Sequence, residues 1–213
     1  MKLMSGIMLL LAAGCSRADA GRTGAPAVAA AIPSTDTARP WRKPGDKIDS
    51  ILPMPEYLRR FRRGRTEPAR LTGGAESRNE LARRFLAAVS ARDTAAFAAL
   101  AVTRAEFAWL VFPYHIYASP PYALDPELFW MQLTAESAKG AHRTLERLGG
   151  TRLTFLGLGC QRDRLQMTSG PARIWSGCEL RYRVGDTVLT RRLFGSIVER
   201  DGRVKLLNFA NGM

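Results

Sequence analysis

Apolar residues recur at helical spacing through the middle of the chain. Ser77 and Glu80 form a capping box, and the apolar positions behind them predict a helix that ends near Arg92. Asp93 or Thr94 should cap a short second helix directly afterwards. The pattern therefore predicts a helical hairpin.

Two more helices are predicted before the pattern changes. Thr103 and Glu106 repeat the capping box, and Pro113 should end this aromatic-rich helix because proline cannot donate the next backbone hydrogen bond. Asp125 as N-cap and a glycine pair at the exit bracket the longest helix.

Beyond Gly150 the apolar positions alternate, as they do in strands. Four strands are predicted, over residues 152–160, 173–184, 187–199 and 203–209. The turn pairs Gly185-Asp186 and Asp201-Gly202 join their neighbours closely, which predicts an antiparallel meander. Helices followed by an antiparallel sheet indicate the α+β class.

The predicted strand at 173–184 has two unlike faces. Alternation puts mainly apolar side chains on one face: Ile174, Cys178, Leu180, Tyr182 and Val184. The other face carries Trp175, Glu179, Arg181 and Arg183. If this second face lined a cavity, Glu179 could act as a base beside Arg181. The alternative is a solvated outer face with cross-strand ion pairs.

Cys160 and Cys178 lie on adjacent predicted strands. A hairpin centred near Ser169 would set the two cysteines opposite each other. In an oxidising compartment such a pair predicts a disulfide, and two buried free thiols are the alternative.

The remaining cysteine, Cys15, follows a segment with the features of an export signal. Lys2 supplies a positive start, residues 3–13 are apolar, and small residues precede the cysteine. The apolar run is too short to span a bilayer. The stretch Leu11-Ala12-Ala13-Gly14-Cys15 resembles the lipobox of bacterial lipoproteins, with Ala12 where that family most often has Leu.

The lipobox resemblance implies that residues 1–14 are a cleaved signal peptide and that Cys15 carries lipid. An ordinary secretory signal cut after Ala18 or Ala20 is the alternative. Ser16 stands where some lipoproteins carry an aspartate that retains them on the inner membrane. Its presence favours the periplasmic face of the outer membrane.

Residues 15–50 contain few large apolar side chains, so we expect a lipidated flexible tether. Residues 51–73 contain a short basic amphipathic helix. Its apolar face carries Met54, Tyr57, Leu58 and Phe61. Five arginines surround that face: Arg59, Arg60, Arg62, Arg63 and Arg65. The apolar face either docks on the domain or lies on an anionic membrane or a partner.

A formal charge of +13 usually indicates a partner rich in phosphate. Export changes this interpretation, because chromosomal DNA is then out of reach whereas anionic lipid and acidic envelope polymers are abundant. The two histidines, His115 and His142, form no compact ligand set with carboxylates, so no metal site is expected. The sequence also lacks a phosphate-binding glycine loop and a nucleophile elbow, and no cofactor is expected.

The helical run at 81–93 and the strand pair at 195–209 resemble the NTF2-like, or SnoaL-like, superfamily. The resemblance covers residues 74–213. It implies N-terminal helices packed on a curved antiparallel sheet that forms a cone with an open cavity. Members include isomerases, dehydratases, cyclases and non-catalytic binding domains, so the fold alone does not decide the function.

We expect a membrane-anchored, non-catalytic domain that binds a small molecule, a peptide or an envelope protein. Candidate ligand contacts are Trp109, Tyr114, Tyr117, Trp130 and Arg181, with the core as the alternative place for the tryptophans. A second interpretation is an enzyme of the same fold that uses Glu179 or His115 as acid or base. A third makes the basic helix the functional part and the domain its mount.

Overall fold

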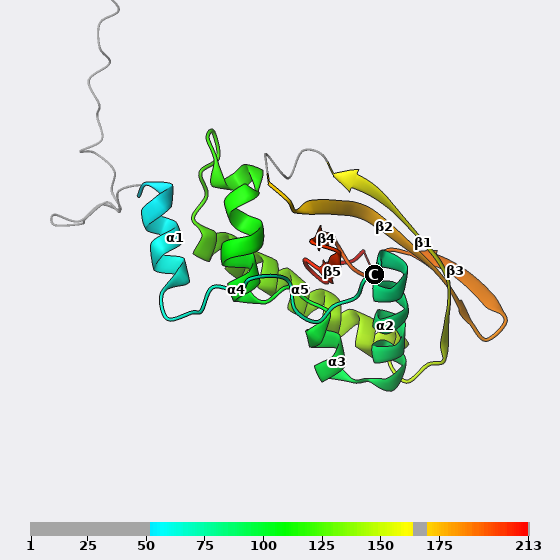
Figure 1. Cartoon of the computed structure of the whole chain (residues 1–213). Coiled ribbons are helices and arrows are strands. Elements are labelled where there is room, and N and C mark those ends of the chain that lie inside the picture. The colour runs from blue at the N-terminus through cyan, green and yellow to red at the C-terminus, as the bar shows by residue number, and fades with distance from the viewer. Residues whose placement is uncertain (1–51, 164–169, 213) are drawn as a thin grey trace, which may run out of the picture. The chain divides into compact units, whose positions relative to one another are not determined.

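The computed structural model describes residues 52–163 and 170–212, which belong to one compact unit at 50–213 (Figure 1). The predicted signal and tether lie outside the described residues. The helical segments are α1 (Met54–Arg62), α2 (Arg78–Ala91), α3 (Thr94–Ala99), α4 (Arg104–Glu106), η2 (Phe107–Val111), η3 (Phe112–Tyr114), η4 (Ile116–Ala118) and α5 (Pro126–Leu148). The strands are β1 (Leu153–Asp163), β2 (Arg173–Val184), β3 (Thr187–Arg191), β4 (Ile197–Arg200) and β5 (Arg203–Leu206). The α+β class is confirmed.

Three helices begin at their predicted caps. At α2 the Ser77 hydroxyl accepts a hydrogen bond from the amide of Glu80 (3.2 Å). At α3 the Asp93 carboxylate accepts one from the amide of Ala96 (2.9 Å). Asp125 caps α5 in the same way. These bonds satisfy amide groups that the first turn of a helix leaves without an intrahelical partner.

The aromatic helix differs from its prediction. α4 is a single turn with the predicted capping box, after which the chain continues as the π-helical turn η2 and the 3-10 turn η3. Pro113 therefore lies within the last helical turn instead of ending the helix. The continued turns place large side chains in the interior, which favours them over an early stop: Phe107, Leu110, Val111 and Phe112.

The sheet is antiparallel and curved, and β2 lies at its centre (Figure 1). One edge of β2 pairs with β1 along most of its length. The other edge pairs with β4 at the start of β2 and with β3 at its end, and β5 pairs with β4. The predicted strand at 187–199 is thus interrupted at residues 192–196. Leu193 and Phe194 turn into the core there. An added Cβ on Gly195 would lie 1.7 Å from Asn208 Oδ1, so the chain passes too close to continue as a regular strand.

A β-bulge changes the predicted alternation in β2. Gly177 and Cys178 lie together opposite Cys160, and Gly177 has a φ of +58°, which glycine adopts at little cost. The bulge shifts the alternation by one residue. Trp175 therefore packs against the same apolar cluster as Cys178, whereas Ile174 packs into a second cluster. The prediction that Ile174 shares a face with Cys178 is wrong.

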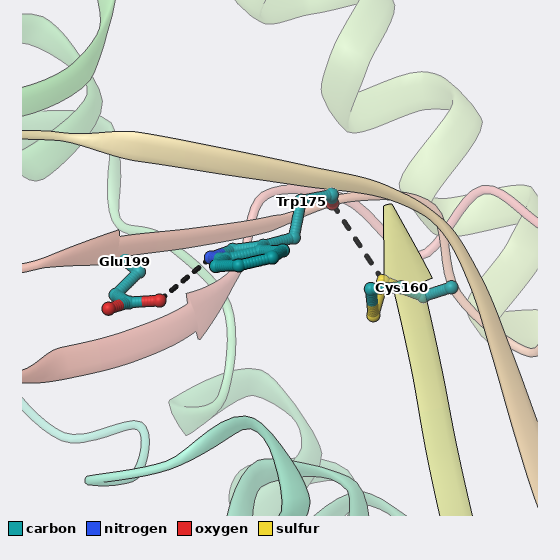
Figure 2. Close-up of a disulfide and its surroundings, with 4 residues drawn as sticks. Cys160, Trp175 and Glu199 are labelled. Atoms are coloured by element: carbon teal, nitrogen blue, oxygen red, sulfur yellow. Dashed lines mark hydrogen bonds between the residues drawn. A yellow bond between two sulfur atoms is a disulfide. The ribbon is translucent and has the colours of Figure 1, made fainter. Parts of the chain in front are cut away.

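The predicted disulfide is present. Cys160 and Cys178 are bonded, with 4.2 Å between their Cα atoms (Figure 2). The bond joins β1 to β2 at the bulge. Nearby, Trp175 Nε1 donates a hydrogen bond of 2.7 Å to Glu199, which connects β2 to β4 on the same side (Figure 2).

The β4–β5 pair is buried on both faces. The first apolar cluster joins the sheet to α2 and α3 and includes Leu81, Phe85, Phe97, Tyr182, Ile197 and Leu206. The second cluster joins the opposite face to α1, η2, η3 and α5 and includes Phe61, Phe107, Phe112, Leu133, Val198 and Leu207. Residues that alternate along β4 and β5 therefore enter different cores.

A buried ion pair lies on the side of the second cluster. Lys205 of β5 and Glu106 of α4 have side chains that are 2% and 1% exposed, and Lys205 Nζ lies 2.8 Å from Glu106 Oε2. The carboxylate also accepts hydrogen bonds from the amides of Thr103 (2.7 Å) and Thr72 (2.7 Å). A buried charge is tolerated when it is paired and hydrogen-bonded in this way.

Burial raises the pKa of Glu106, but the hydrogen bonds from Lys205, Thr103 and Thr72 outweigh this effect and hold the pKa below its ordinary value of 4.5. A carboxyl whose pKa is lowered by folding adds stability above its unfolded-state pKa. That stability is lost as the pH falls through the folded-state pKa. The ion pair therefore stabilises the fold at neutral pH and weakens in acid below pH 4.5.

Glu106→Gln should lower the free energy of unfolding at neutral pH by about 3 kcal/mol, because Lys205 is then buried without a counter-ion. The difference from wild type should shrink below about pH 4, where the wild-type carboxylate takes up a proton. Urea unfolding across this pH range measures both effects. Glu136→Gln is the matched control, since Glu136 forms an exposed pair with Lys139, and it should change stability little. Equal losses in both variants would contradict the role given to Glu106.

Candidate functional site

A pocket of about 310 Å³ lies among the η4 turn, α5 and the segment after β5. We call it the His115 pocket. Its aromatic lining is formed by His115, Tyr117 and Phe129. Its polar lining is formed by Gln132, Glu136, Ser196 and Asn208. The pocket therefore presents ring surfaces together with amide, hydroxyl and carboxylate groups.

His115 is held by the turn that follows it. Its Nδ1 accepts a hydrogen bond from the amide of Tyr117 (3.2 Å), so His115 caps η4. The residue is 2% exposed, and its ring centroid lies 5.3 Å from that of Phe129. Capping and packing together fix the imidazole.

The aromatic lining has a defined geometry. The Tyr117 ring stands at 88° to the Phe129 ring, with 5.2 Å between centroids. Tyr122 meets Tyr117 edge-on from outside, also at 5.2 Å. Perpendicular pairs of this kind are favourable aromatic contacts. They hold the rings in place beside the pocket.

The polar lining comes from two distant parts of the chain. Gln132 and Glu136 belong to α5, which also supplies Phe129 at helical spacing. Asn208 follows β5, and its Oδ1 accepts a hydrogen bond from the amide of Ala210 (3.2 Å). A side-chain hydrogen bond from Lys139 lowers the pKa of Glu136. Glu136 is therefore an anion at neutral pH.

Of the residues predicted to bind a ligand, only Tyr117 lines the His115 pocket together with the predicted acid or base, His115. Trp130 packs on Phe107, with 5.0 Å between ring centroids, and belongs to the second core. Tyr114 lies below the Arg200 guanidinium, 5.6 Å from its ring centroid. The ring of Trp109 is 5.1 Å from the guanidinium of Arg62 and also packs on that core.

Glu179 and Arg181 lie elsewhere. Both are exposed, on the side of β2 opposite the buried Leu180 and Tyr182. Glu179 forms no ion pair among the described residues, so the cross-strand ion pairs proposed for this face are not seen. The carboxylate that does line the His115 pocket is Glu136 of α5, so the alternation of the strand at 173–184 could not indicate it. The helical spacing of Phe129, Gln132 and Glu136 could have shown that they share one face of the helix.

The basic amphipathic helix is docked on the domain. Phe61 is 1% exposed and meets Phe107 edge-on, with 6.1 Å between ring centroids. Met54 and Leu58 are half-buried against the same cluster. The apolar face of α1 therefore belongs to the second core, which is the first of the two predicted alternatives.

Most of the arginines predicted to contact an anionic surface form ion pairs or hydrogen bonds within the domain. Arg59 and Arg60 share the Glu56 carboxylate, at 2.6 and 2.7 Å. Arg62 donates two hydrogen bonds to the Ala108 carbonyl, at 3.1 and 3.0 Å. Arg65 donates to the carbonyls of residues 61 and 63. Of the five, only Arg63 is exposed with a side chain that forms no hydrogen bond or ion pair to another described residue.

Three other pockets are of similar size. A groove of about 450 Å³ between α2 and α3 has five alanines in its lining, together with Arg84 and Asp93. A pocket of about 430 Å³ beside the C-terminal segment shares Ser196, Asn208 and Ala210 with the His115 pocket. A third, of about 340 Å³, has a mainly polar lining at the start of α2. We favour the His115 pocket because it combines three aromatic side chains with several polar groups, whereas the C-terminal pocket has Phe194 as its one aromatic side chain.

No family model, no curated protein and no solved structure matches this chain. Among the residues that the structure describes, no helix is long and apolar enough to cross a membrane. Within the same ranges, no three His, Cys, Asp or Glu side chains gather where they could hold a metal ion. The function must therefore be argued from the pocket and the surface.

Phe61→Ala should lower the free energy of unfolding by about 3 kcal/mol, because it empties a buried ring site between α1 and η2. Thermal and urea unfolding measure the loss. Leu128→Ala is the control, since Leu128 is an apolar helical side chain that is 46% exposed, and it should change stability by less than about 0.5 kcal/mol. An unchanged melting temperature for Phe61→Ala would show that α1 does not depend on the domain.

Proposed function

We propose that this chain is an envelope lipoprotein whose domain binds a small ring-bearing molecule in the His115 pocket without transforming it. The volume of about 310 Å³ lies at the lower end of the range for small-molecule pockets. The perpendicular rings of Tyr117 and Phe129 offer an apolar slot, and Gln132 and Asn208 offer amide groups at its edge. This combination in one pocket is the observation that carries the proposal.

The ionisation of the pocket favours binding over acid or base catalysis. A general acid or base works best with a pKa near the working pH. The pKa of Glu136 is instead lowered by Lys139, and the carboxylate is exposed. His115 uses Nδ1 to cap η4, so this nitrogen does not exchange protons with a ligand. Glu179 is exposed on β2 and is not part of this lining.

We also propose that the domain is an NTF2-like cone. Support comes from helices that precede a curved antiparallel sheet, with α2 and α3 packed on its concave side. That side is filled by Phe85, Phe97 and Tyr182, which are all buried. A ligand is therefore better accommodated at the His115 pocket than deep within the sheet. A peptide or an envelope protein fits this small pocket less well than a single ring system.

Attachment to a membrane through a lipidated Cys15 completes the proposal, with the periplasmic face of the outer membrane as the preferred location. The lipobox resemblance supports it, and so does the disulfide, which needs an oxidising compartment to form. The domain would then hold its ligand close to the membrane surface.

Cys15→Ser should release the protein from the membrane fraction or leave an unprocessed precursor, since the serine cannot accept the thioether-linked lipid. Cell fractionation and gel mobility distinguish wild type from variant. The Cys160→Ser and Cys178→Ser pair is the control for loss of cysteine as such, and it should leave attachment unchanged. Unchanged attachment and processing in Cys15→Ser would refute lipidation.

Ala210→Phe should weaken binding of N-phenyl-1-naphthylamine, a neutral fluorescent probe with two aromatic ring systems, by about ten-fold or more, because the new ring occupies the His115 pocket. Ala99→Phe is the matched control in the alanine-lined groove and should leave binding unchanged. Fluorescence titration gives both dissociation constants. Loss of probe binding in the Ala99 variant alone would move the site to that groove. No binding by wild type would remove the support for a ring-shaped ligand.

A further inference from the structure

The exposed side of the sheet carries several arginines whose side chains form no hydrogen bond or ion pair among the described residues. Arg181 and Arg183 are exposed on β2, where they alternate with the buried Leu180 and Tyr182. Arg152 directly before β1 and Arg192 directly after β3 are exposed as well, and Arg192 also lines the pocket beside the C-terminal segment. Glu179 is the one acidic residue on this side of β2. We call Arg152, Arg181, Arg183 and Arg192 the sheet arginines.

The sheet arginines are not neutralised within the molecule. None of them forms an ion pair or a hydrogen bond that involves its side chain among the described residues, and neither does Glu179. Even with the exposed Asp186 of the β2–β3 turn counted beside Glu179, four positive charges stand against two negative ones. By contrast, Arg59, Arg60 and Arg62 of α1 already have partners in Glu56 and Ala108.

The surface around the sheet arginines is open. Arg181 pairs with Gly157 on β1, and an added Cβ at that glycine would meet nothing within 4 Å. The same holds at Gly159 and Gly177. Two apolar side chains lie within this area: Leu156 of β1 is 38% exposed, and Val188, which pairs with Arg183, is 41% exposed. An open face with free guanidinium groups and a few apolar side chains suits an extended, negatively charged partner.

We propose that this face of β1, β2 and β3 docks on a bilayer with anionic phospholipid headgroups. The charge complementarity is that of guanidinium and phosphate, which form paired hydrogen bonds. The proposal rests on the proposed function in one respect, namely that Cys15 brings the domain to a bilayer. A lipid anchor alone would set the distance of the domain from the membrane but not its orientation. The sheet arginines would set that orientation.

The test uses the full chain with Cys15→Ser, so that lipid attachment plays no part in the result. Binding is measured by co-sedimentation with vesicles of neutral phosphatidylcholine, with and without about one third phosphatidylglycerol. Arg181→Gln with Arg183→Gln should weaken binding to the anionic vesicles by about 25-fold, because each arginine contributes a factor of about five. Binding of the parent chain should fall steeply with salt, since exposed charges are screened.

Arg70→Gln with Arg147→Gln is the matched control. It removes the same net charge from two exposed arginines outside this face, and it should change binding less than about three-fold. Thermal unfolding checks that each variant folds. A third variant, Arg59→Gln with Arg60→Gln and Arg63→Gln, tests whether α1 supplies the contact instead.

Equal weakening by the sheet and control pairs would overturn the proposal, because it would show a net-charge effect without a defined face. Loss of binding only in the α1 variant, or no binding to anionic vesicles by the parent chain, would also overturn it. Stronger binding to a soluble acidic polysaccharide than to vesicles, lost in the sheet variant, would reassign the face to a polymer and refute the lipid partner. None of these results depends on whether Cys15 is lipidated, which the fractionation experiment decides separately.

Discussion

The ion pair between Glu106 and Lys205 constrains the arrangement of the whole domain. Lys205 is the middle of a strand that is buried on both faces, so its ammonium group needs a partner within the protein. That partner is Glu106 in α4, and its carboxylate also accepts a hydrogen bond from the amide of Thr72. Three segments that are far apart in the chain are thereby fixed at one point.

The two walls of the His115 pocket both continue from the Glu106–Lys205 ion pair. Glu106 ends α4, η2 and η3 follow it directly, and the extended His115 then leads into η4, so that His115 and Tyr117 reach the pocket. On the other side, β5 leads from Lys205 directly to Asn208 and Ala210, which complete the lining. The edge of β5 is covered by bridges to Ala75 and Ala101, so this strand cannot shift on its own. A change in the ion pair would move both walls of the pocket.

Features decided by neighbours in sequence could be predicted, and features decided by contacts across the fold could not. The caps at Ser77, Asp93 and Asp125 are local hydrogen bonds, and their helices begin there. The break at 192–196 arises because Gly195, before β4, meets Asn208, after β5, and no periodicity encodes this contact. For the same reason His115 and Tyr117, which are two residues apart in sequence, could be named as site candidates, but Ser196 and Asn208 could not.

The basic helix shows what a charge pattern does not determine, and its contact with an anionic surface stays a prediction. Five arginines in a short amphipathic segment predicted contact with an anionic surface, but Glu56 lies one turn before two of them, and the Ala108 carbonyl accepts from a third. Sequence alone counts charges and does not show which are already paired.

The bulge at Gly177 decides which side chains of β2 are exposed. It places Trp175 on the core side and, together with the disulfide to Cys160, fixes the register that keeps Arg181 and Arg183 outside. A slip of one residue would reverse both assignments, because side chains in a strand alternate. The orientation of the basic face is therefore set by one glycine and one covalent bond, and not by the number of arginines.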